Sequence, residues 1–389
     1  MYFDLTLYRL MLQLAWSEPR LRPRLTALFV ALVFIPLYSG ATALFYLLDK
    51  LSPSLHRVRI EKPVFVVGHA RSGTTLLHRL MVSDAEHFNF FLLYELLFPS
   101  LWQKRLLRGV GTIDRVLFRS FFKKKLVAAE DDAFEDARDM HDIGLFIPEE
   151  DDFVLTASCV ASTWVALFPG LPEFDVYYVD EWPEKRRRRV MGAYAEGVRR
   201  QLCLSGAHKI HCSKNPSYSG RISSLIEQFP DARFVVMMRD PREAIPSLLK
   251  MLKKVWLGQG WSQARIERSL EALIANSVHT YLYPMETLAK HPETKWTVVD
   301  YRDLVSQPKA TVEAVYDALD IEMTPATSAA LDAQQGRART HQSSHSYGLE
   351  EFGIDEAQLK LDLRELFDRF EWDAPPSAHE TLEQGSKHG

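Results

Sequence analysis

A glycine-rich loop directly after an apolar segment constrains the fold of this 389-residue chain more than any other feature. Val64–Val67 is an apolar, mostly β-branched run, which is typical of a buried strand. The loop Gly68–Thr75 has a glycine, four residues, a second glycine and then the start of a helix. Glycines at this spacing let backbone N–H groups turn towards an anion, and a helix N-terminus adds its positive end. The segment therefore predicts an α/β fold with an anion-binding site after its first strand.

Three later segments have the same strand-like character and are separated by helical patterns. The predicted strands are Lys209–Cys212, Arg233–Met238 and Trp296–Val299. The clearest predicted helices cover about 74–83, 218–229 and 262–290, and Pro241 is expected to open another at its first turn. Strands that alternate with helices predict a P-loop-like, mainly parallel sheet flanked by helices on both faces.

The N-terminal segment is a hydrophobic helical arm, which we assign to residues 1–52. Ala27–Leu48 is uncharged over 22 residues, which is long enough to span a bilayer, and three arginines precede it. Pro36 and Gly40 interrupt this stretch. The arm is expected to cross the membrane, to break near Pro36 into two half-length helices that dip into one leaflet and return, to lie on the membrane surface, or to pack as a buried helix. The second and third arrangements keep the rest of the chain in the cytoplasm.

Composition narrows the class of protein. The net charge of −4 gives no basic excess for nucleic-acid binding. The three cysteines have no metal-binding or disulfide-like spacing, so we expect a reduced, cytoplasmic compartment. The predicted organisation is the arm, one catalytic domain over residues 60–375 and a flexible tail over residues 376–389. The arm gives the protein a possible membrane contact within residues 1–50.

The loop lacks the lysine that nucleotide triphosphatases use. Thr74 stands at that position, and no acidic residue at a strand end makes a convincing magnesium site, Asp300 being the best candidate. We therefore expect the loop to hold a phosphate-like group of lower charge, without a metal. Arg71 supplies the cation, and the residues predicted to bind the group are Arg71, Ser72, Gly73, Thr74 and Thr75. A P-loop kinase or nucleotide hydrolase is the alternative.

A second anion site is predicted at the end of the third strand. Arg239 follows that strand, and Ser247 lies eight residues later in the next helix. An arginine at the carboxyl end of a parallel strand points into the crevice where α/β proteins bind ligands. An arginine with a serine suits a terminal phosphate.

These motifs together resemble a known family. The segment from Arg71 to Thr75 resembles the 5'-phosphosulfate loop of the sulfotransferases, and Arg239 with Ser247 resembles their 3'-phosphate motif. Ser213–Pro216 is similar to the lysine segment of the broad sulfotransferase group that is related to the protein-tyrosine sulfotransferases. The resemblance covers roughly residues 60–370. It implies transfer of a sulfuryl group from 3'-phosphoadenosine-5'-phosphosulfate to a hydroxyl by in-line attack, with no metal.

The resemblance also supplies candidate catalytic residues. In the protein-tyrosine enzymes a glutamate at a similar distance from the loop is the base, which points to Glu95; the alternative is a structural glutamate at a helix start. His141 is the rival, because cytosolic sulfotransferases use a histidine base. Lys214 is the candidate for stabilising the bridging oxygen. The acidic run 149–152 is interpreted as a solvated helix start.

Two expectations concern the ligands. A late loop rich in arginine and histidine, with Tyr347 near its end, is predicted to close over the 3'-phosphate or the adenine, or else to be a mobile surface loop. The many apolar residues between positions 85 and 170 favour a lipid-like or otherwise apolar alcohol as acceptor. A catalytically silent, membrane-attached binding protein on the same scaffold is the alternative outside the enzymes.

Overall fold

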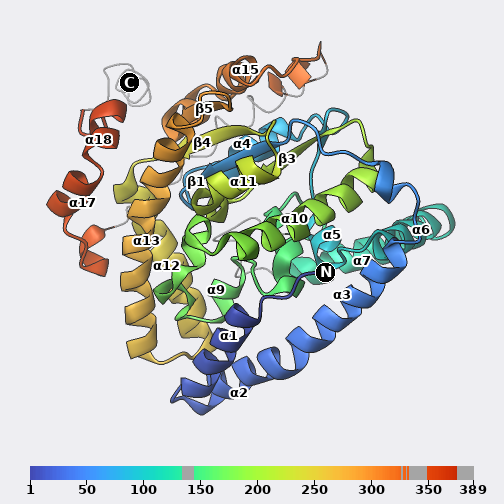
Figure 1. The fold of residues 1–389 in the computed structure, drawn as a ribbon, viewed down its shortest axis with the longest axis horizontal. Helices are drawn as coiled ribbons and strands as arrows, with labels where there is room; N and C mark the ends of the chain where they lie inside the picture. Colours follow the sequence, from blue (N-terminus) through green and yellow to red (C-terminus); the bar gives the residue numbers. More distant parts are fainter. Residues whose placement is uncertain (134–143, 326, 330, 333–347, 375–389) are drawn as a thin grey trace, which may run out of the picture.

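A parallel sheet lies at the centre of the computed structural model, which describes residues 1–133, 144–325, 327–329, 331–332 and 348–374 (Figure 1). Its strands, in the order β2–β3–β1–β4–β5, are all parallel. They are β1 (Val64–Gly68), β2 (Phe88–Asn89), β3 (Ile210–Lys214), β4 (Arg233–Met238) and β5 (Lys295–Asp300). The predicted fold class and four strands are confirmed. β2 was not predicted, because two residues give no periodicity.

The sheet is buried on both faces because its strands alternate between two hydrophobic clusters. Val64 and Val66 of β1 pack on one side with α4 (Thr74–Met81) and α15 (Pro308–Ala318). Phe65 and Val67 pack on the other side with α10 (Glu184–Ser205), α11 (Ile222–Gln228), α12 (Pro241–Gln259) and α13 (Gln263–Ala289). The remaining α-helices are α5 (Leu93–Leu97), α6 (Leu101–Leu117), α7 (Phe121–Ala133), α9 (Trp164–Leu167), α14 (Tyr301–Ser306), α17 (Glu356–Asp362) and α18 (Arg364–Phe370).

The N-terminal arm consists of a short helix and one long, unbroken helix. After α1 (Leu5–Ser17), a continuous helical run contains α2 (Leu21–Phe29), a π-helical turn η1 (Val30–Phe34) and α3 (Ile35–Asp49). The break expected at Pro36 does not occur. A proline ring clashes with the carbonyl four residues earlier, and the wider π turn just before Pro36 relieves this clash. The run is long and apolar enough to cross a membrane by length and composition.

One side of the long helix packs into the protein. Ala27, Ala31 and Ile35 recur every four residues, are buried and belong to the same hydrophobic cluster as the sheet. Ser39 continues this side and donates a hydrogen bond of 2.8 Å to the carbonyl of Ala157. Figure 1 shows the helix along one edge of the molecule. The expectation of a buried helix is therefore met on one side of the long helix only.

Buried ion pairs hold the arm to the domain at three points: before α1, between α1 and α2, and at the end of α3. They are Asp4 with Arg186 (2.8 Å), Glu18 with Arg265 (3.1 Å) and Asp49 with Arg200 (2.7 Å). Each of these three carboxylate side chains is almost fully buried. Asp49 also caps α6, since it accepts hydrogen bonds from the backbone N–H groups of Leu101 and Trp102.

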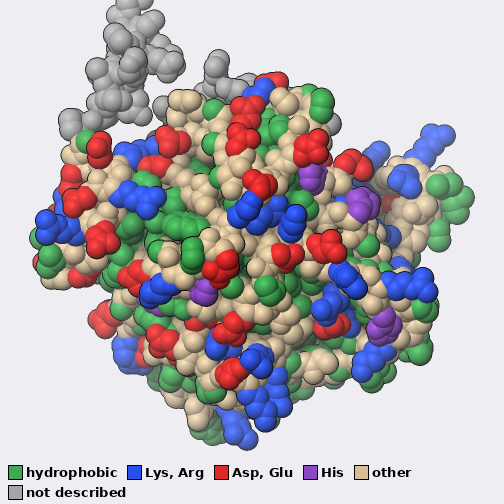
Figure 2. All heavy atoms as spheres, turned by 45° about the horizontal axis from the view of Figure 1, so that its top comes forward, with side chains coloured by type: hydrophobic (Ala, Val, Ile, Leu, Met, Phe, Trp, Pro, Cys, Tyr) green, Lys and Arg blue, Asp and Glu red, His purple; other side chains and the backbone are tan. Residues whose placement is uncertain are grey.

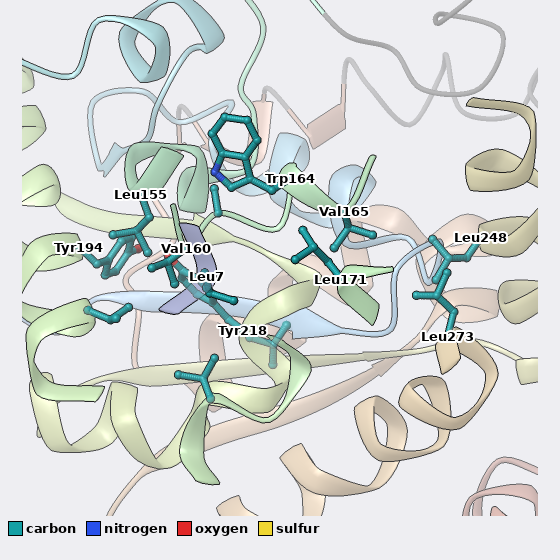
Figure 3. Close-up of a cluster of buried hydrophobic side chains, with 14 of the residues drawn as sticks. Leu7, Leu155, Val160, Trp164, Val165, Leu171, Tyr194, Tyr218, Leu248 and Leu273 are labelled. Atoms are coloured by element: carbon teal, nitrogen blue, oxygen red, sulfur yellow. The ribbon is translucent and has the colours of Figure 1, made fainter. Parts of the chain in front are cut away.

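The hydrophobic cluster joins the arm to the wall of the cavity beside the loop after β1. Figure 3 shows Leu7 of α1 beside Val160, with Val165, Leu248 and Leu273 further along the same cluster. The last three side chains also line the cavity described below. The arm and the cavity wall are thus packed through one continuous core.

Candidate functional site

The predicted anion-binding loop connects β1 to α4 and forms one end of a cavity of about 600 Å³. Gly73 precedes α4 with a φ of 92°, a left-handed conformation that glycine adopts without strain. A Cβ atom at Gly73 would lie 2.5 Å from the ring of Tyr301. Both facts require glycine here. The N-terminus of α4 therefore opens directly onto the cavity.

The two arginine motifs meet at this cavity. Arg71 lies in the loop, and its Nε donates a 3.1 Å hydrogen bond to Oγ of Ser247 on α12. Arg239, at the end of β4, donates from Nη1 to the carbonyl oxygen of Arg71 at 3.0 Å. Both arginines line the cavity. The structure thus brings together Arg71, Arg239 and Ser247, which the sequence predicted to bind two ends of one donor.

Arg239 is held by several neighbours. Its Nη2 donates to Glu243 at 2.8 Å, and its guanidinium lies 4.5 Å from the ring centroid of Tyr301. The hydroxyl of Tyr281 donates to the carbonyl oxygen of Arg239 at 2.8 Å. The side chain of Glu243 is 57% exposed. An incoming phosphate would therefore replace a solvated carboxylate as the partner of Arg239, at small cost.

His69, in the loop after β1, contacts two residues of α13 and so fixes the loop against that helix. Its ring stacks on Tyr281 with centroids 4.9 Å apart, and its Nε2 lies 2.9 Å from Oγ of Ser277. Burial lowers the pKa of His69 to about 4, so the ring is neutral at physiological pH. His69 therefore positions the loop without adding charge to the cavity.

The far wall of the cavity is mostly apolar. Its apolar side chains come from α9, α12 and α13, and they are Val165, Ala166, Leu248, Met251, Leu252 and Leu273. Polar side chains stand among them, and these are Ser162, Thr163, Ser217, Asn276, Ser277 and Thr280. The cavity thus has a cationic end at the loop and an apolar end suited to a nonpolar molecule.

Two glutamates lie in the cavity wall beside a buried lysine. Glu149 and Glu150 line the cavity, and their Oε1 atoms lie 3.3 and 3.2 Å from Nζ of Lys214. The Lys214 side chain is fully buried. Burial lowers the pKa of Lys214, but Glu150 and Glu149 outweigh it, and the net shift is upward. Lys214 is therefore a charged partner of the two glutamates, and it is not among the described residues that line the cavity.

The acidic run 149–152 is not a solvated helix start, as the sequence analysis expected. Asp151 and Asp152 are buried. Asp151 accepts hydrogen bonds from Nε2 of His211 (3.0 Å), from Ser213 (2.9 Å) and from Tyr194. Buried carboxylates require such partners, because desolvation without them is costly. The run anchors the loop before η3 (Asp151–Ser158) to β3 and so fixes the two glutamates in the cavity wall.

Glu95 lies apart from the described residues that line the cavity. It is buried at the start of α5, where its carboxylate accepts hydrogen bonds from Gln201 (2.7 Å), Arg108 (2.9 Å), Tyr94 (3.1 Å) and the N–H of Leu92 (3.1 Å). This geometry is that of a structural glutamate at a helix start. The structure does not bring Glu95 together with Arg71 and Arg239.

Other candidates fall at different places. Asp300 caps α14 and pairs with Arg302 at 2.6 Å, which gives it a structural role. Ser72 and Thr74 are buried in the loop, and Thr75 lines the cavity with Thr74. His141 and Tyr347, with the rest of the late arginine- and histidine-rich loop, lie outside the described residues.

Sequence reasoning missed the contribution of Glu149 and Glu150 to the cavity. A signal was present, since Lys214 follows a buried strand and a buried lysine needs a carboxylate partner. The partner lies more than sixty residues away, at the end of an irregular segment. Arg79, one turn into α4, also lines the cavity and was not singled out.

Comparisons with known proteins agree with this geometry. A family model described as "Sulfotransferase family" matches residues 63–325. The Omega-hydroxy-beta-dihydromenaquinone-9 sulfotransferases Stf3 of Mycobacterium bovis and Mycobacterium tuberculosis are each 27% identical over 274 residues. These alignments cover 67% of this chain and 63% of each relative, so the chain matches less than two thirds of their length.

Two solved structures share the fold. Sulfotransferase STF9 from Mycobacterium avium superposes with a TM-score of 0.68 at 16% identity, over 95% of this chain and 97% of that one. Sulfotransferase STF1 from Mycobacterium tuberculosis H37Rv gives 0.64 at 21% identity, over 91% of each chain. Because 95% of this chain is covered in the first case, most of residues 1–52 belong to the shared fold.

Proposed function

The chain belongs to the sulfotransferase family, and from this we propose that it transfers a sulfuryl group from 3'-phosphoadenosine-5'-phosphosulfate to the hydroxyl of a lipid-like acceptor. The observation that carries the donor assignment is that Arg71 and Arg239 line one cavity, with Arg71 hydrogen-bonded both to Ser247 and to Arg239. One adenosine carrying two anionic ends would engage both motifs at once. We place this reaction in the cytoplasm, in a catalytic domain over residues 60–375.

The loop and α4 are proposed to hold the 5'-phosphosulfate. Backbone N–H groups of the loop and the hydroxyls of Thr74 and Thr75 donate to its oxygens, and the helix N-terminus favours its negative charge. Arg71 neutralises charge that develops on the bridging oxygen as the S–O bond breaks. The phosphosulfate carries less charge than a nucleoside triphosphate, which is consistent with Thr74 in place of a lysine.

Arg239 and Ser247 are proposed to hold the 3'-phosphate. An arginine binds two phosphate oxygens at once through its planar fork, and the serine hydroxyl donates to a third. Tyr301 keeps the Arg239 guanidinium in place from one side. These contacts fix the nucleotide and leave its sulfuryl group facing the rest of the cavity.

Glu150 is the base that the geometry favours. It lines the cavity beside the loop, and its side chain is 24% exposed, whereas Glu149 is 3% exposed. In the proposed step the acceptor oxygen forms a bond to sulfur, its proton passes to Glu150, and adenosine 3',5'-bisphosphate leaves. Lys214 donates a 3.2 Å hydrogen bond to Oε1 of Glu150 and so orients the carboxylate. Lys214 then acts through Glu150 and is a positioning residue.

The acceptor is proposed to be an apolar alcohol. The wall opposite the loop is largely aliphatic, so it favours a nonpolar chain over a sugar or a charged molecule. The names of the two curated relatives specify a hydroxylated menaquinone derivative, which is a molecule of this class. Comparison of sulfated lipids by mass spectrometry, with and without the gene, tests the assignment. An unchanged pool of sulfated lipids would count against it.

Binding of adenosine 3',5'-bisphosphate tests the donor site. Replacing both Arg71 and Arg239 with alanine removes two charge-assisted sets of hydrogen bonds, each worth about 1.5–3 kcal/mol. Calorimetry should therefore show at least a roughly 100-fold weaker affinity, with the circular dichroism spectrum unchanged. The matched control replaces Arg188 and Arg189, two exposed arginines of α10, and should bind like the wild type. Equal affinity of the double variant would reject the donor, and magnesium-dependent turnover of ATP would indicate the kinase or hydrolase class.

A further inference from the structure

The long arm helix presents a continuous apolar side to the outside. Between Leu21 and Asp49 ten of the fifteen exposed residues are large and hydrophobic, and only Arg22 and Thr26 among the fifteen have polar side chains. The ten are Leu21, Leu25, Phe29, Leu32, Val33, Phe34, Leu37, Leu44, Leu47 and Leu48. Monomeric soluble proteins rarely expose so many apolar groups in one place. This side of the helix therefore has a partner other than water.

The α6–α7 hairpin extends the same surface. Nε1 of Trp102 on α6 donates a 3.2 Å hydrogen bond to the carbonyl of Leu48, which places the two elements side by side. The exposed apolar side chains of the hairpin are Trp102, Leu106, Val110, Ile113, Val116, Leu117, Phe118, Phe121, Phe122 and Leu126. We refer to the exposed sides of helix 21–49 and of residues 101–126 together as the apolar face.

The apolar face carries positive charge. No acidic residue occurs from position 19 to 48, and the acids at 18, 49 and 114 are buried. The exposed basic side chains are Arg20, Arg22, Lys50, Arg105, Arg108, Arg115, Arg119, Lys123, Lys124 and Lys125. The end of the hairpin forms the lobe at the right of Figure 2, where hydrophobic and basic side chains stand together.

Both ends of the long helix are fixed to one body. Glu18, just before the helix, pairs with Arg265, and Asp49, its last residue, pairs with Arg200. A helix that crosses a bilayer would carry its two ends to opposite sides, which would separate at least one of these buried pairs. Breaking a buried ion pair is strongly destabilising. The helix, about 43 Å long, is therefore held against the protein along its length.

From these observations we propose that the apolar face lies flat on the surface of an anionic lipid bilayer. Hydrophobic side chains enter the boundary between headgroups and acyl chains, and the basic side chains contact anionic headgroups. A second copy of the chain fits less well, because a symmetric contact would place the same positive charges opposite each other. The inference uses no feature of the donor site and does not rest on the proposed reaction.

Vesicle flotation with the full-length protein tests the surface. The protein should float with vesicles that contain 30% phosphatidylglycerol in phosphatidylcholine, and much less with phosphatidylcholine alone. The triple change Lys123→Glu, Lys124→Glu and Lys125→Glu should lower the partition coefficient about 100-fold, since each basic residue near the surface contributes about 1 kcal/mol. These lysines are exposed on α7 and lie away from the described cavity lining, so folding should be unaffected.

A matched control changes Lys185, Arg188 and Arg189 on α10 to glutamate. These side chains are exposed and outside the apolar face, and the net charge changes equally. This control should keep at least half of the wild-type binding to anionic vesicles. An equal loss in both triple variants would show that net charge alone is responsible and would overturn the proposal. Absence of flotation, with a dimer in solution that the α7 variant disrupts, would also overturn it.

The depth of the helix distinguishes a flat from a spanning orientation. A fluorophore is placed on a single cysteine at position 25, 37 or 48, in a protein whose three native cysteines are replaced by serine or alanine. Quenching by lipids with nitroxides at known depths should report similar, shallow depths of about 5–10 Å at all three positions. A central depth at 37, with 25 and 48 near opposite surfaces, would overturn the flat orientation.

Discussion

Lys104 is a buried lysine of α6 whose side chain reaches α10. Its ammonium donates to Oε1 of Gln201 at 2.7 Å and lies 4.7 Å from the ring centroid of Phe91. Burial lowers the pKa of Lys104 from 10.5 to about 7, although Glu95 acts in the opposite direction. The unfolded chain therefore binds more protons than the folded chain between these pH values.

The first prediction concerns the pH dependence that Lys104 creates. A lowered lysine pKa makes the free energy of unfolding rise with pH between about 7 and 10.5, by about 1.4 kcal/mol per unit. Lys104→Met removes this contribution, so its stability relative to the wild type should fall by about 2–3 kcal/mol from pH 7 to pH 9. Urea unfolding at both pH values measures the difference. Lys50→Met changes an exposed lysine and should show no such pH dependence. If Lys104→Met instead changes the free energy of unfolding by the same amount at pH 7 and pH 9, the lowered pKa of Lys104 is contradicted.

The second prediction separates Glu150 from Glu95 as the base. Glu150→Gln should lower kcat by about 10²–10⁴-fold, since general-base catalysis contributes this much, and should leave the binding of adenosine 3',5'-bisphosphate nearly unchanged. Glu95→Gln should instead lower the stability, because it disturbs four hydrogen bonds at the start of α5. The readout is release of adenosine bisphosphate from the donor with a lipid extract as acceptor source. If Glu95→Gln folds but shows no turnover while Glu150→Gln remains active, the base is Glu95 and the assignment of Glu150 is wrong.

The proposed donor site was more predictable from sequence than the proposed base. Arg71 and Gly73 belong to a short loop, and Arg239 and Ser247 are eight residues apart, so local patterns carry their roles. Parallel strands then bring the two motifs to one edge of the sheet. The contact of Glu150 with Lys214 depends on how an irregular segment folds back on β3, and no periodic pattern encodes that path.

At the scale of elements, apolar strands of five or six residues and long helices were predictable, because their patterns repeat. The π turn at Val30–Phe34 was not, since it leaves the composition of the helix unchanged and appears only as an altered hydrogen bond. A proline in a helical pattern indicates a break or a kink, so the alternatives for the arm included a break at Pro36. The side of the helix that is buried also depends on the partner elements η3 and α6, which come later in the chain.

The third prediction concerns the junction of α3 with α6. Asp49 accepts hydrogen bonds from Ser100, from two backbone N–H groups of α6 and from Arg200. Asp49→Ala leaves a buried arginine without this partner, and the free energy of unfolding should fall by about 3–5 kcal/mol. Chemical denaturation measures it. The neighbouring exposed Lys50→Ala should change stability by less than about 0.5 kcal/mol, and a similarly small effect of Asp49→Ala would contradict the role of this junction.

At the scale of the whole molecule, the arm completes the core. Met11, Ala15, Ala27, Ala31 and Ile35 of the arm are buried in the same cluster as the sheet and the cavity wall. The family model begins at residue 63, yet the structural likeness to STF9 extends over nearly all of this chain. Sequence similarity therefore marks the part that contains Arg71, Ser247 and Arg239, whereas packing marks a larger unit that includes the arm.

The fourth prediction tests that larger unit. Deletion of residues 1–52 exposes the apolar side chains that the arm covers and removes the carboxylate partners of Arg186, Arg200 and Arg265. The shortened protein should aggregate or unfold without a cooperative transition, whereas the full chain should unfold cooperatively. Calorimetry and size-exclusion chromatography make the comparison. A soluble fragment with the midpoint of the full chain would show that the domain is independent of the arm.

The ion pair between Glu18 and Arg265 has a consequence for biosynthesis. Ribosomes add roughly 5–20 residues per second, so the segment that carries Arg265 emerges some 10–50 s after the start of the long helix. This apolar helix is therefore translated before the residues that later cover one of its sides. Until Arg265 has emerged, its docking side and its outer side are both uncovered, which makes this stretch of the nascent chain prone to aggregation.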